Sequence, residues 1–268
     1  MIDFAALRRA NGPLNAFTDF DEGAAPGTGP LSDLTVGVKA NIMVRGLPWT
    51  GGMEIHRNRI ADRDAEVVKL LRSNGAAILG VLNMEEAALG SKTDNPWFGP
   101  VHNPHRIGHS PGGSSGGSGA AVAAGLCDVA LGTDTMGSVR IPAAHCGIYG
   151  FKPATGCVSQ DGLDPADLSL DAIGPLARDL DTLERAARVL SDFGDDAIDG
   201  AGATLGDHGV IVEPPVAAAF DRACAALAAP PARFTLDWPP SRIRFAGFVH
   251  VARALSAHLA GADPAKLS

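Results

Sequence analysis

Apolar residues along the chain gather in short runs that are bounded by Gly, Pro or polar residues. Three such runs cover residues 34–38, 76–82 and 128–131 and consist mainly of Val, Leu, Ile and Ala. Runs of this length and composition predict buried strands. The first predicted strand ends at Lys39, so a basic side chain stands where this strand stops.

The residues between these strands favour helices. Residues 62–74 begin with acidic side chains, carry apolar side chains at adjacent positions and stop before Gly75, a common residue after a helix end. The same reasoning predicts helices over 117–126, which is built from small side chains, and over 179–193 and 214–227.

A further helix is predicted after the second strand, with Asn83 as its cap and Glu85 and Glu86 in its first turn, near the positive end of the helix dipole. Alternating strands and helices predict an α/β fold, with a mixed, largely parallel sheet covered by helices on both faces. Ligands of such sheets bind at the carboxyl ends of the strands. The turns at Lys39, Asn83 and Gly132 all lie at such ends.

The composition restricts the class of protein. The 268 residues are 46% hydrophobic and 19% charged, which supports a folded core and excludes intrinsic disorder. A formal net charge of −8, with no run of Lys or Arg, argues against a nucleic-acid or membrane partner. The four cysteines lack the spacing of a metal site, and the start lacks the apolar core of a signal peptide. We therefore expect a soluble, cytoplasmic protein.

A Gly- and Ser-rich segment at 111–119 leads directly into the helix of small side chains. A flexible linker would not continue at once into a helix and an apolar strand. A phosphate-binding loop of the Walker type needs a Lys that is absent between Lys92 and Lys152. Residues 112–116 match the G-x-S-x-G nucleophile elbow in form, but that elbow follows a strand, and 102–110 reads as loop. The nucleophile elbow is therefore the second-ranked interpretation of residues 112–116.

A second serine-bearing turn covers residues 132–138 and does follow a predicted strand. A turn rich in Gly and Thr can point several backbone N–H groups at one place, as an oxyanion hole requires. Ser138 closes this turn and is positioned to react at the same place. A serine hydroxyl is a weak nucleophile and needs a base close to it.

These segments resemble the amidase signature family of serine hydrolases. The resemblance rests on residues 112–118, 132–143 and 150–153, and on a strand end at 37–39 that carries the lysine. It extends from about residue 14 to residue 178, with the motifs in the family's order, and continues weakly beyond.

The resemblance implies a Ser–cis-Ser–Lys catalytic unit that needs no metal and no cofactor. Ser138 is then the nucleophile, Ser114 the bridging serine after a cis peptide bond, and Lys39 the base. Because a lysine ammonium ordinarily has a pKa near ~10.4, the site must desolvate Lys39 and keep carboxylates from pairing with it. The implied oxyanion hole consists of the backbone N–H groups of Thr135, Met136, Gly137 and Ser138.

Three departures from the family pattern stand out. Ala40 replaces the usual Asp after the lysine, and Met136 replaces a Gly in the oxyanion turn, where its side chain narrows the acyl pocket. The family's chains also continue well past residue 268. We therefore expect residues 1–268 to form a single, incomplete amidase signature domain. Its core motifs lie in 30–178, and 179–268 is a helical continuation that is cut short.

The function expected from this resemblance is hydrolysis of the C–N bond of a small-molecule amide through a Ser138 acyl-enzyme. The expected partner is the small-molecule amide itself, with no nucleic acid and no membrane, and a homodimer is compatible. Two alternatives remain open. One is the glutaminase (A) subunit of a tRNA-dependent amidotransferase, although Ile141 stands where that subunit carries Gln. The other is an inactive fragment that needs a partner chain.

Other polar residues near these motifs have simpler interpretations. Asp134 is expected to bond to the backbone of its own turn, and Arg140 to pair with an acidic group and brace that turn. The histidines of 102–109 are interpreted as solvated loop residues, because Pro and Gly between them break the helix that would align a metal site. Cys146 and Trp49 are expected to pack in the core.

Overall fold

The computed structural model describes residues 2–194, 203–206, 208–227 and 231–268. The chain divides into two compact units, one of residues 1–193 with 255–268 and one of residues 194–254. The first unit carries every predicted motif. The expectation of a single domain over 1–268 stays a prediction, and the helical continuation predicted for 179–268 lies partly outside the described residues.

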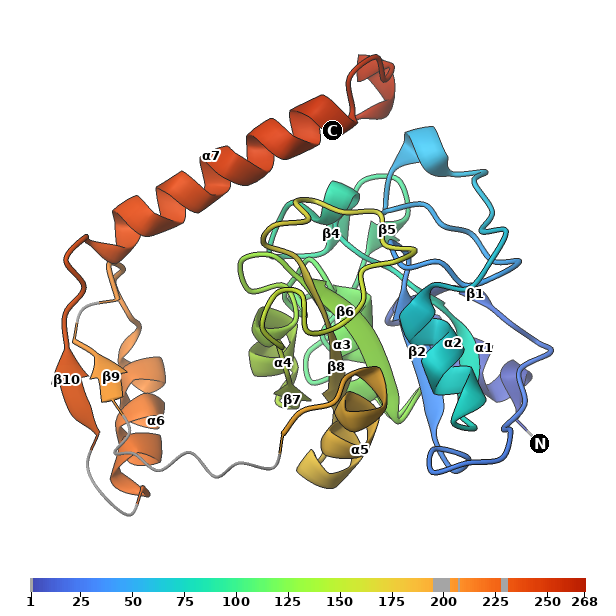
Figure 1. The fold of residues 1–268 in the computed structure, drawn as a ribbon, viewed down its shortest axis with the longest axis horizontal. Helices are drawn as coiled ribbons and strands as arrows, with labels where there is room; N and C mark the ends of the chain where they lie inside the picture. The colour runs from blue at the N-terminus through green and yellow to red at the C-terminus, as the bar shows by residue number, and fades with distance from the viewer. Residues whose placement is uncertain (1, 195–202, 207, 228–230) are drawn as a thin grey trace. The chain divides into compact units, whose positions relative to one another are not determined.

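A six-stranded sheet forms the centre of the first unit, in the order β1-β3-β2-β6-β8-β7 (Figure 1). The three central strands β3, β2 and β6 are parallel, and β1, β8 and β7 run antiparallel to their neighbours. The mixed α/β sheet predicted from the sequence is therefore confirmed. The strands are β1 Phe17–Phe20, β2 Thr35–Lys39, β3 Ala77–Leu82, β6 Val129–Asp134, β7 Tyr149–Gly150 and β8 Ala172–Ala177.

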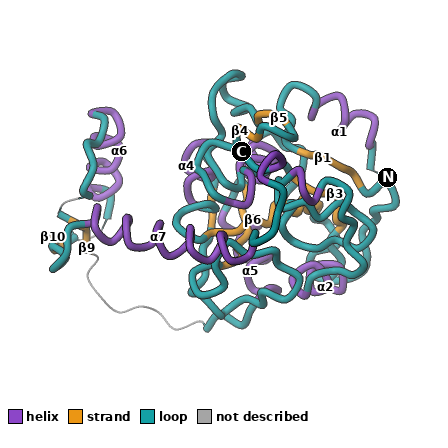
Figure 2. The backbone as a smooth tube through the Cα atoms, turned by 90° about the horizontal axis from the view of Figure 1, so that it is seen from above, coloured by secondary structure: helices purple, strands orange, loops and turns teal. Residues whose placement is uncertain are grey.

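Helices cover both faces of this sheet. Helix α3 packs on β2, β6 and β8 and against α4, whereas α5 packs on β8 and against α2. Figure 2 shows α2 and α5 below the strands and α4 above them. The helices of this unit are α1 Phe4–Asn11, α2 Glu66–Ser73, α3 Gly116–Ala123, α4 Arg140–Cys146 and α5 Leu180–Leu190. Its short elements are η1 Glu54–His56, η2 Glu86–Ala88, η3 Pro264–Lys266 and the two-stranded pair β4 Asp94–Asn95 and β5 Gly99–Pro100.

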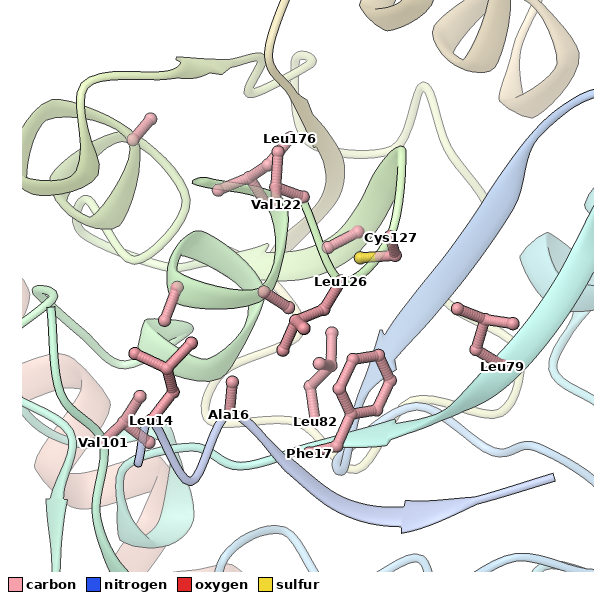
Figure 3. Close-up of a cluster of buried hydrophobic side chains, with 14 of the residues drawn as sticks. Leu14, Ala16, Phe17, Leu79, Leu82, Val101, Val122, Leu126, Cys127 and Leu176 are labelled. Carbon is pink, nitrogen blue, oxygen red and sulfur yellow. The ribbon is translucent and has the colours of Figure 1, made fainter. Parts of the chain in front are cut away.

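Small side chains let α3 lie deep in the core. All residues from Gly116 to Val122 are buried, and the apolar cluster around this helix includes Phe17 and Leu82 (Figure 3). A Cβ atom at Gly117 would lie 2.3 Å from the carbonyl oxygen of Asn83. The helix therefore approaches the end of β3 more closely than any residue with a side chain permits.

The prediction of a helix after Asn83 is wrong. Only the short turn η2 forms there, and Ala87 has a φ of 50°. The backbone N–H of Glu85 donates to the carbonyl oxygen of Ser114 at 3.0 Å, and its carboxylate accepts the N–H of Lys92 at 2.9 Å. Contacts to the Gly/Ser loop thus replace the helical hydrogen bonds.

The described residues of the second unit form two helical segments and two short strands. Helix α6 Pro214–Ala225 confirms the helix predicted over 214–227. Strands β9 Ala203–Leu205 and β10 Ala232–Phe234 pair in parallel. Helix α7 Pro240–His258 begins in this unit, and its residues from Leu255 onward belong to the first unit.

Replacing Gly117 by Ala tests the close approach of α3. We expect Gly117→Ala to lower the free energy of unfolding by about 3 kcal/mol, because the new methyl group meets backbone atoms that cannot move aside. The control is Gly12→Ala, where the Cβ would lie at an ordinary 3.5 Å from the nearest atom. Urea unfolding of both variants measures the difference. Equal stability of the two variants would show that the core accommodates the methyl group.

Candidate active site

Lys39 ends strand β2 inside the protein. The register of β2 with β6 pairs Val38 with Leu131 and so brings Lys39 beside the end of β6. The Lys39 side chain is fully buried, and its Nζ donates to Ser114 Oγ and to Thr133 Oγ1, each at 2.7 Å. The structure thus brings together Lys39 and Ser114, which lie 75 positions apart in the chain.

The charge state of Lys39 follows from this burial. Burial lowers the pKa of the Lys39 ammonium to about 7, and the negative charges of Asp171, Asp134 and Glu85 oppose the shift. Because both hydrogen-bond partners of the Nζ atom are neutral hydroxyl groups, no ion pair holds the proton on the lysine. Neutral and charged Lys39 are therefore both populated near pH 7.

Hydrogen bonds to two other segments fix the loop that carries Ser114. The peptide bond between Gly113 and Ser114 is cis, as the resemblance implied. The Ser114 carbonyl accepts the N–H of Glu85, and Ser115 Oγ donates to the Thr133 carbonyl at 3.2 Å. These bonds tie the loop to the end of β6, where Thr133 contacts Lys39.

Ser138 closes the turn after β6 and lies against the same loop. The N–H of Ser115 donates to the Ser138 carbonyl at 3.3 Å, and the Ser138 residue is 8% exposed. The loop of Ser114 and the turn of Ser138 are therefore in direct backbone contact. All three residues of the predicted catalytic unit lie in one region of the first unit.

The carboxylate of Asp134 organises the Ser138 turn. It accepts the N–H of Gly137 at 2.7 Å and of Val139 at 3.2 Å, and Arg140 Nε donates to it at 2.9 Å. Burial alone would raise the pKa of Asp134, but these hydrogen bonds and the Arg140 charge hold it below its usual value. Asp134 and Arg140 thus have the bracing roles predicted from the sequence.

The hydrogen bond between the Gly137 N–H and Asp134 reduces the number of N–H groups that can form the oxyanion hole. The Gly137 N–H, one of the four predicted donors, already has the Asp134 carboxylate as its acceptor. The N–H groups of Thr135, Met136 and Ser138 are the candidates that remain.

Asp171 is a site residue that the sequence analysis missed. It is 1% exposed, and its carboxylate accepts the hydroxyl of Thr135 at 2.5 Å and the N–H of Ala166 at 2.9 Å. Burial raises the pKa of Asp171, against the opposing effect of its hydrogen bonds. Asp171 thereby anchors the first residue of the Ser138 turn after β6. Its role depends on the pairing of β8 with β6, which no local sequence pattern predicted.

Thr133 and Asn41 were also missed. Thr133 accepts from Lys39, and the Asn41 side-chain amide donates to the same Thr133 hydroxyl at 3.3 Å. Both residues lie at strand ends, Thr133 within β6 and Asn41 just after β2. The parallel pairing of these strands would have placed them together.

A hollow of about 360 Å³ opens beside the Ser138 turn. Met136, which is 42% exposed, and Ile141 contribute apolar side chains to it, and His145 lies at its lining. Residues Met136, Gly137, Arg140, Ile141, Ala144 and His145 form its wall.

Other predicted residues lie outside this arrangement. Cys146 is buried, as expected, and burial raises the pKa of its thiol to about 12. His105 contacts the Cys146 carbonyl at 2.8 Å, so it is not simply solvated as predicted. Trp49 is only partly buried, because its ring packs under the guanidinium of Arg59 at 3.8 Å rather than in the core. The Glu85 carboxylate accepts the backbone N–H of Lys92 and does not lie in the first turn of a helix, as the sequence analysis predicted.

Comparison with known proteins places the chain in a family. The family model named Amidase matches residues 10–199. The chain belongs to the amidase family.

It is 47% identical over 166 residues to the A subunit of glutamyl-tRNA(Gln) amidotransferase from Methanothermobacter thermautotrophicus, a match that covers 62% of this chain and 37% of the relative. It is 44% identical over 206 residues to the same subunit from Salinibacter ruber, covering 72% and 40%. The chain thus spans about two fifths of the length of these curated relatives.

Solved structures agree with this family. A chain from a vestigial protein complex described as revealing the origins of an s-triazine catabolic enzyme matches with a TM-score of 0.88 and 33% identity, covering 98% of this chain and 65% of that chain. The glutamyl-tRNA(Gln) amidotransferase A subunit from Thermotoga maritima matches with a TM-score of 0.85 and 29% identity, covering 97% and 63%. The amidase fold expected from the sequence is therefore confirmed.

The expected partners need correction. The sequence analysis predicted a small-molecule amide substrate with no nucleic acid, and allowed a homodimer. The curated relatives are instead named as one subunit of a glutamyl-tRNA(Gln) amidotransferase. The overall negative charge misled the prediction, because the net charge of one chain does not show whether its relatives assemble into a complex that handles nucleic acid. Among the described helices, none is long and apolar enough to cross a membrane.

The bracing of the Ser138 turn is testable by substitution. We expect Asp134→Ala to lower the free energy of unfolding by about 2–3 kcal/mol, because two N–H groups of the turn lose their acceptor. Arg140→Ala should cost about 1 kcal/mol or less, since its side chain is 55% exposed and Asp134 keeps its backbone donors. Urea denaturation compares the two. A larger loss for Arg140→Ala would contradict this assignment of the bracing role.

Proposed function

We propose that the chain carries the glutaminase chemistry of an amidotransferase, in which Ser138 hydrolyses the side-chain amide of glutamine and releases ammonia. The observation that carries the proposal is the contact between Lys39 and Ser114. A buried amine whose pKa is about 7, hydrogen-bonded to a serine hydroxyl, is a base that works near neutral pH. The identity to the curated amidotransferase subunits supports the choice of glutamine among amides.

Acylation begins with neutral Lys39. The hydrogen bond between its Nζ and Ser114 Oγ then runs in the opposite sense, with the serine hydroxyl donating to the amine. Ser138 Oγ attacks the carbonyl carbon of the amide, its proton passes to Ser114 Oγ, and the Ser114 proton passes to Lys39. The C–O bond forms as the carbonyl π electrons move to oxygen, and the resulting oxyanion is stabilised by the N–H groups of Thr135, Met136 and Ser138.

Collapse of this intermediate releases ammonia. The proton on Lys39 returns through Ser114 to the amide nitrogen, the C–N bond breaks, and an ester of Ser138 remains. Water then attacks the ester carbonyl by the same proton route, and the carboxylic acid leaves with Ser138 regenerated. Every proton that the base takes up is returned, so the cycle needs no metal, cofactor or oxidant.

The nucleophile is testable by covalent labelling. We expect a fluorophosphonate probe to modify the 268-residue chain at Ser138, and glutamine to be hydrolysed with release of ammonia. Ser138→Ala should abolish both, whereas Cys146→Ser should retain labelling because the Cys146 side chain is buried and donates to the Pro111 carbonyl, a contact that a hydroxyl group can also make. Peptide mass spectrometry identifies the modified residue. Labelling at another serine, or hydrolysis by Ser138→Ala, would refute the assignment.

The base is testable by pH. The active form has neutral Lys39, and because the pKa of Lys39 is about 7, kcat/KM should rise with pH and reach half of its plateau near pH 7. Lys39→Met should lower kcat by roughly 10²–10⁴-fold, which is the usual contribution of acid–base catalysis. Lys69→Met, at a lysine paired with Glu66 on the surface, serves as the control. A rate that does not change between pH 5.5 and 8.5 would contradict the role of Lys39.

The choice of substrate has a separate test. Steady-state ammonia release is compared for glutamine, asparagine, acetamide and benzamide with the same preparation. The proposal predicts the highest kcat/KM for glutamine. Labelling at Ser138 combined with a preference for another amide would keep the catalytic unit and overturn the glutaminase assignment.

A further inference from the structure

Asp171 lies directly before strand β8, at the end of the sheet where β6 enters the Ser138 turn. The antiparallel register of β6 with β8 pairs Asp134 with Ala172, and its continuation by one residue brings Thr135 opposite Asp171. The Thr135 hydroxyl donates to the Asp171 carboxylate at 2.5 Å. The end of one strand thus supplies a carboxylate that holds the first residue after its neighbour.

The hydrogen bonds of this carboxylate favour its charged form. Besides the Thr135 hydroxyl, it accepts the backbone N–H of Ala166 at 2.9 Å and of Asp167 at 3.1 Å. Because an N–H group can only donate, the oxygen that faces the two N–H groups must present its lone pairs. Asp171 is 1% exposed, and among the described residues no Lys or Arg forms an ion pair with it. Its negative charge is therefore buried without a contacting cation.

Lys39 is the cation on which this charge acts. Asp171 has the largest of the charge effects that oppose the fall in the pKa of Lys39 to about 7, followed by Asp134 and Glu85. The positive charge of Lys39 in turn lowers the pKa of Asp171, against the rise that burial causes. Asp134 already pairs with Arg140. Asp171 is therefore the main counter-charge of the ammonium form of Lys39.

We propose that Asp171 is a positioning residue with two separable effects. Its hydrogen bond to the Thr135 hydroxyl holds the Thr135 N–H at the oxyanion hole, and its negative charge stabilises the positive charge that Lys39 acquires when it takes up the serine proton. Both effects act at the same step, because the attack of Ser138 creates the oxyanion and the ammonium together. The proposal rests on the serine mechanism proposed above, and it does not depend on glutamine as the substrate.

Replacing Asp171 by Asn tests the effect of the charge. Asn has the size of Asp, and its Oδ1 can keep the two N–H groups while its Nδ2 donates to the Thr135 oxygen. Loss of a negative charge disfavours the ammonium, so the titration midpoint of Lys39, followed by NMR of its ε carbon, should fall by roughly 0.5–1 pH unit. The pH at which fluorophosphonate labelling of Ser138 reaches half of its plateau should fall by the same amount.

Replacing Thr135 by Val tests the hydrogen bond separately. Val has the shape of Thr without the hydroxyl, and the charge of Asp171 remains. The plateau rate of Ser138 labelling should fall about tenfold, because the N–H of residue 135 is no longer held at the oxyanion hole. The Lys39 midpoint should stay at its wild-type value. Thr135→Ser restores the hydroxyl and should recover the labelling rate.

A second buried acid provides the control. Asp164 is 6% exposed, its carboxylate contacts Arg59 and His258, and it is not among the charges that act on Lys39. Asp164→Asn should leave the Lys39 midpoint unchanged. Circular dichroism and urea unfolding verify that each variant is folded.

The two variants can each overturn the proposal. A Lys39 midpoint that does not fall in Asp171→Asn, or that falls equally in Asp164→Asn, would refute the charge effect. Labelling of Thr135→Val at the wild-type rate would refute the role of the hydrogen bond. Because neither measurement uses glutamine, a different preferred amide would overturn the glutaminase assignment and leave the result for Asp171 intact.

Discussion

The removal of the Lys39 ammonium from water is the constraint on which the active-site region depends. Burial of a charged amine is costly, and the two hydroxyl groups that contact its Nζ atom cannot repay that cost as a carboxylate would. The pKa of Lys39 consequently falls to about 7. The neutral amine that a serine nucleophile needs is thus a product of the fold, because the parallel pairing of β2 and β6 carries the side chain into the interior.

The carboxylates around Lys39 are hydrogen-bonded to other groups, and this arrangement favours the neutral form of the lysine. Asp134 is engaged by Arg140 and by N–H groups of the Ser138 turn, and Asp171 by the Thr135 hydroxyl and two N–H groups. Glu85 accepts N–H groups that follow it in the chain. Each negative charge has its own donors and does not contact the lysine. The same bonds hold the turns that carry Ser114 and Ser138, so the charge state of the base and the placement of the serines have a common origin.

Local patterns in the sequence were sufficient for the central strands, whereas the proposed catalytic residues came from the resemblance to the amidase signature family and stay a prediction. Apolar runs predicted β2, β3 and β6, and the small residues after the Gly/Ser loop predicted α3. The Asn83 helix failed because a contact distant in sequence, from Glu85 to the Ser114 loop, outweighs local helix preference. Tertiary contacts determine the conformation of the segment after Asn83, and no local sequence pattern encodes those contacts.

Strand β8 was missed, and helix α7 was predicted only as part of a helical continuation over 179–268. The strand Ala172–Ala177 contains Gly174 and Pro175, which weaken a strand pattern, and it forms because β6 pairs with it along its whole length. In α7 the apolar residues are largely exposed, so the pattern of a helix packed on a core is absent. The roles of Thr133 and Asp171 could be recognised only once the strand register was known, because these roles depend on which strand ends lie together.

The most direct test of this account is a titration of Lys39 itself. With lysine labelled by ¹³C at the ε carbon, NMR follows the Lys39 resonance with pH, and Lys39→Met identifies it by its disappearance. The account predicts a Lys39 midpoint near pH 7, well below the ordinary lysine value of 10.5. A Lys39 midpoint above pH 10 in the folded chain would show that the buried amine remains charged at neutral pH, and would contradict its assignment as the base.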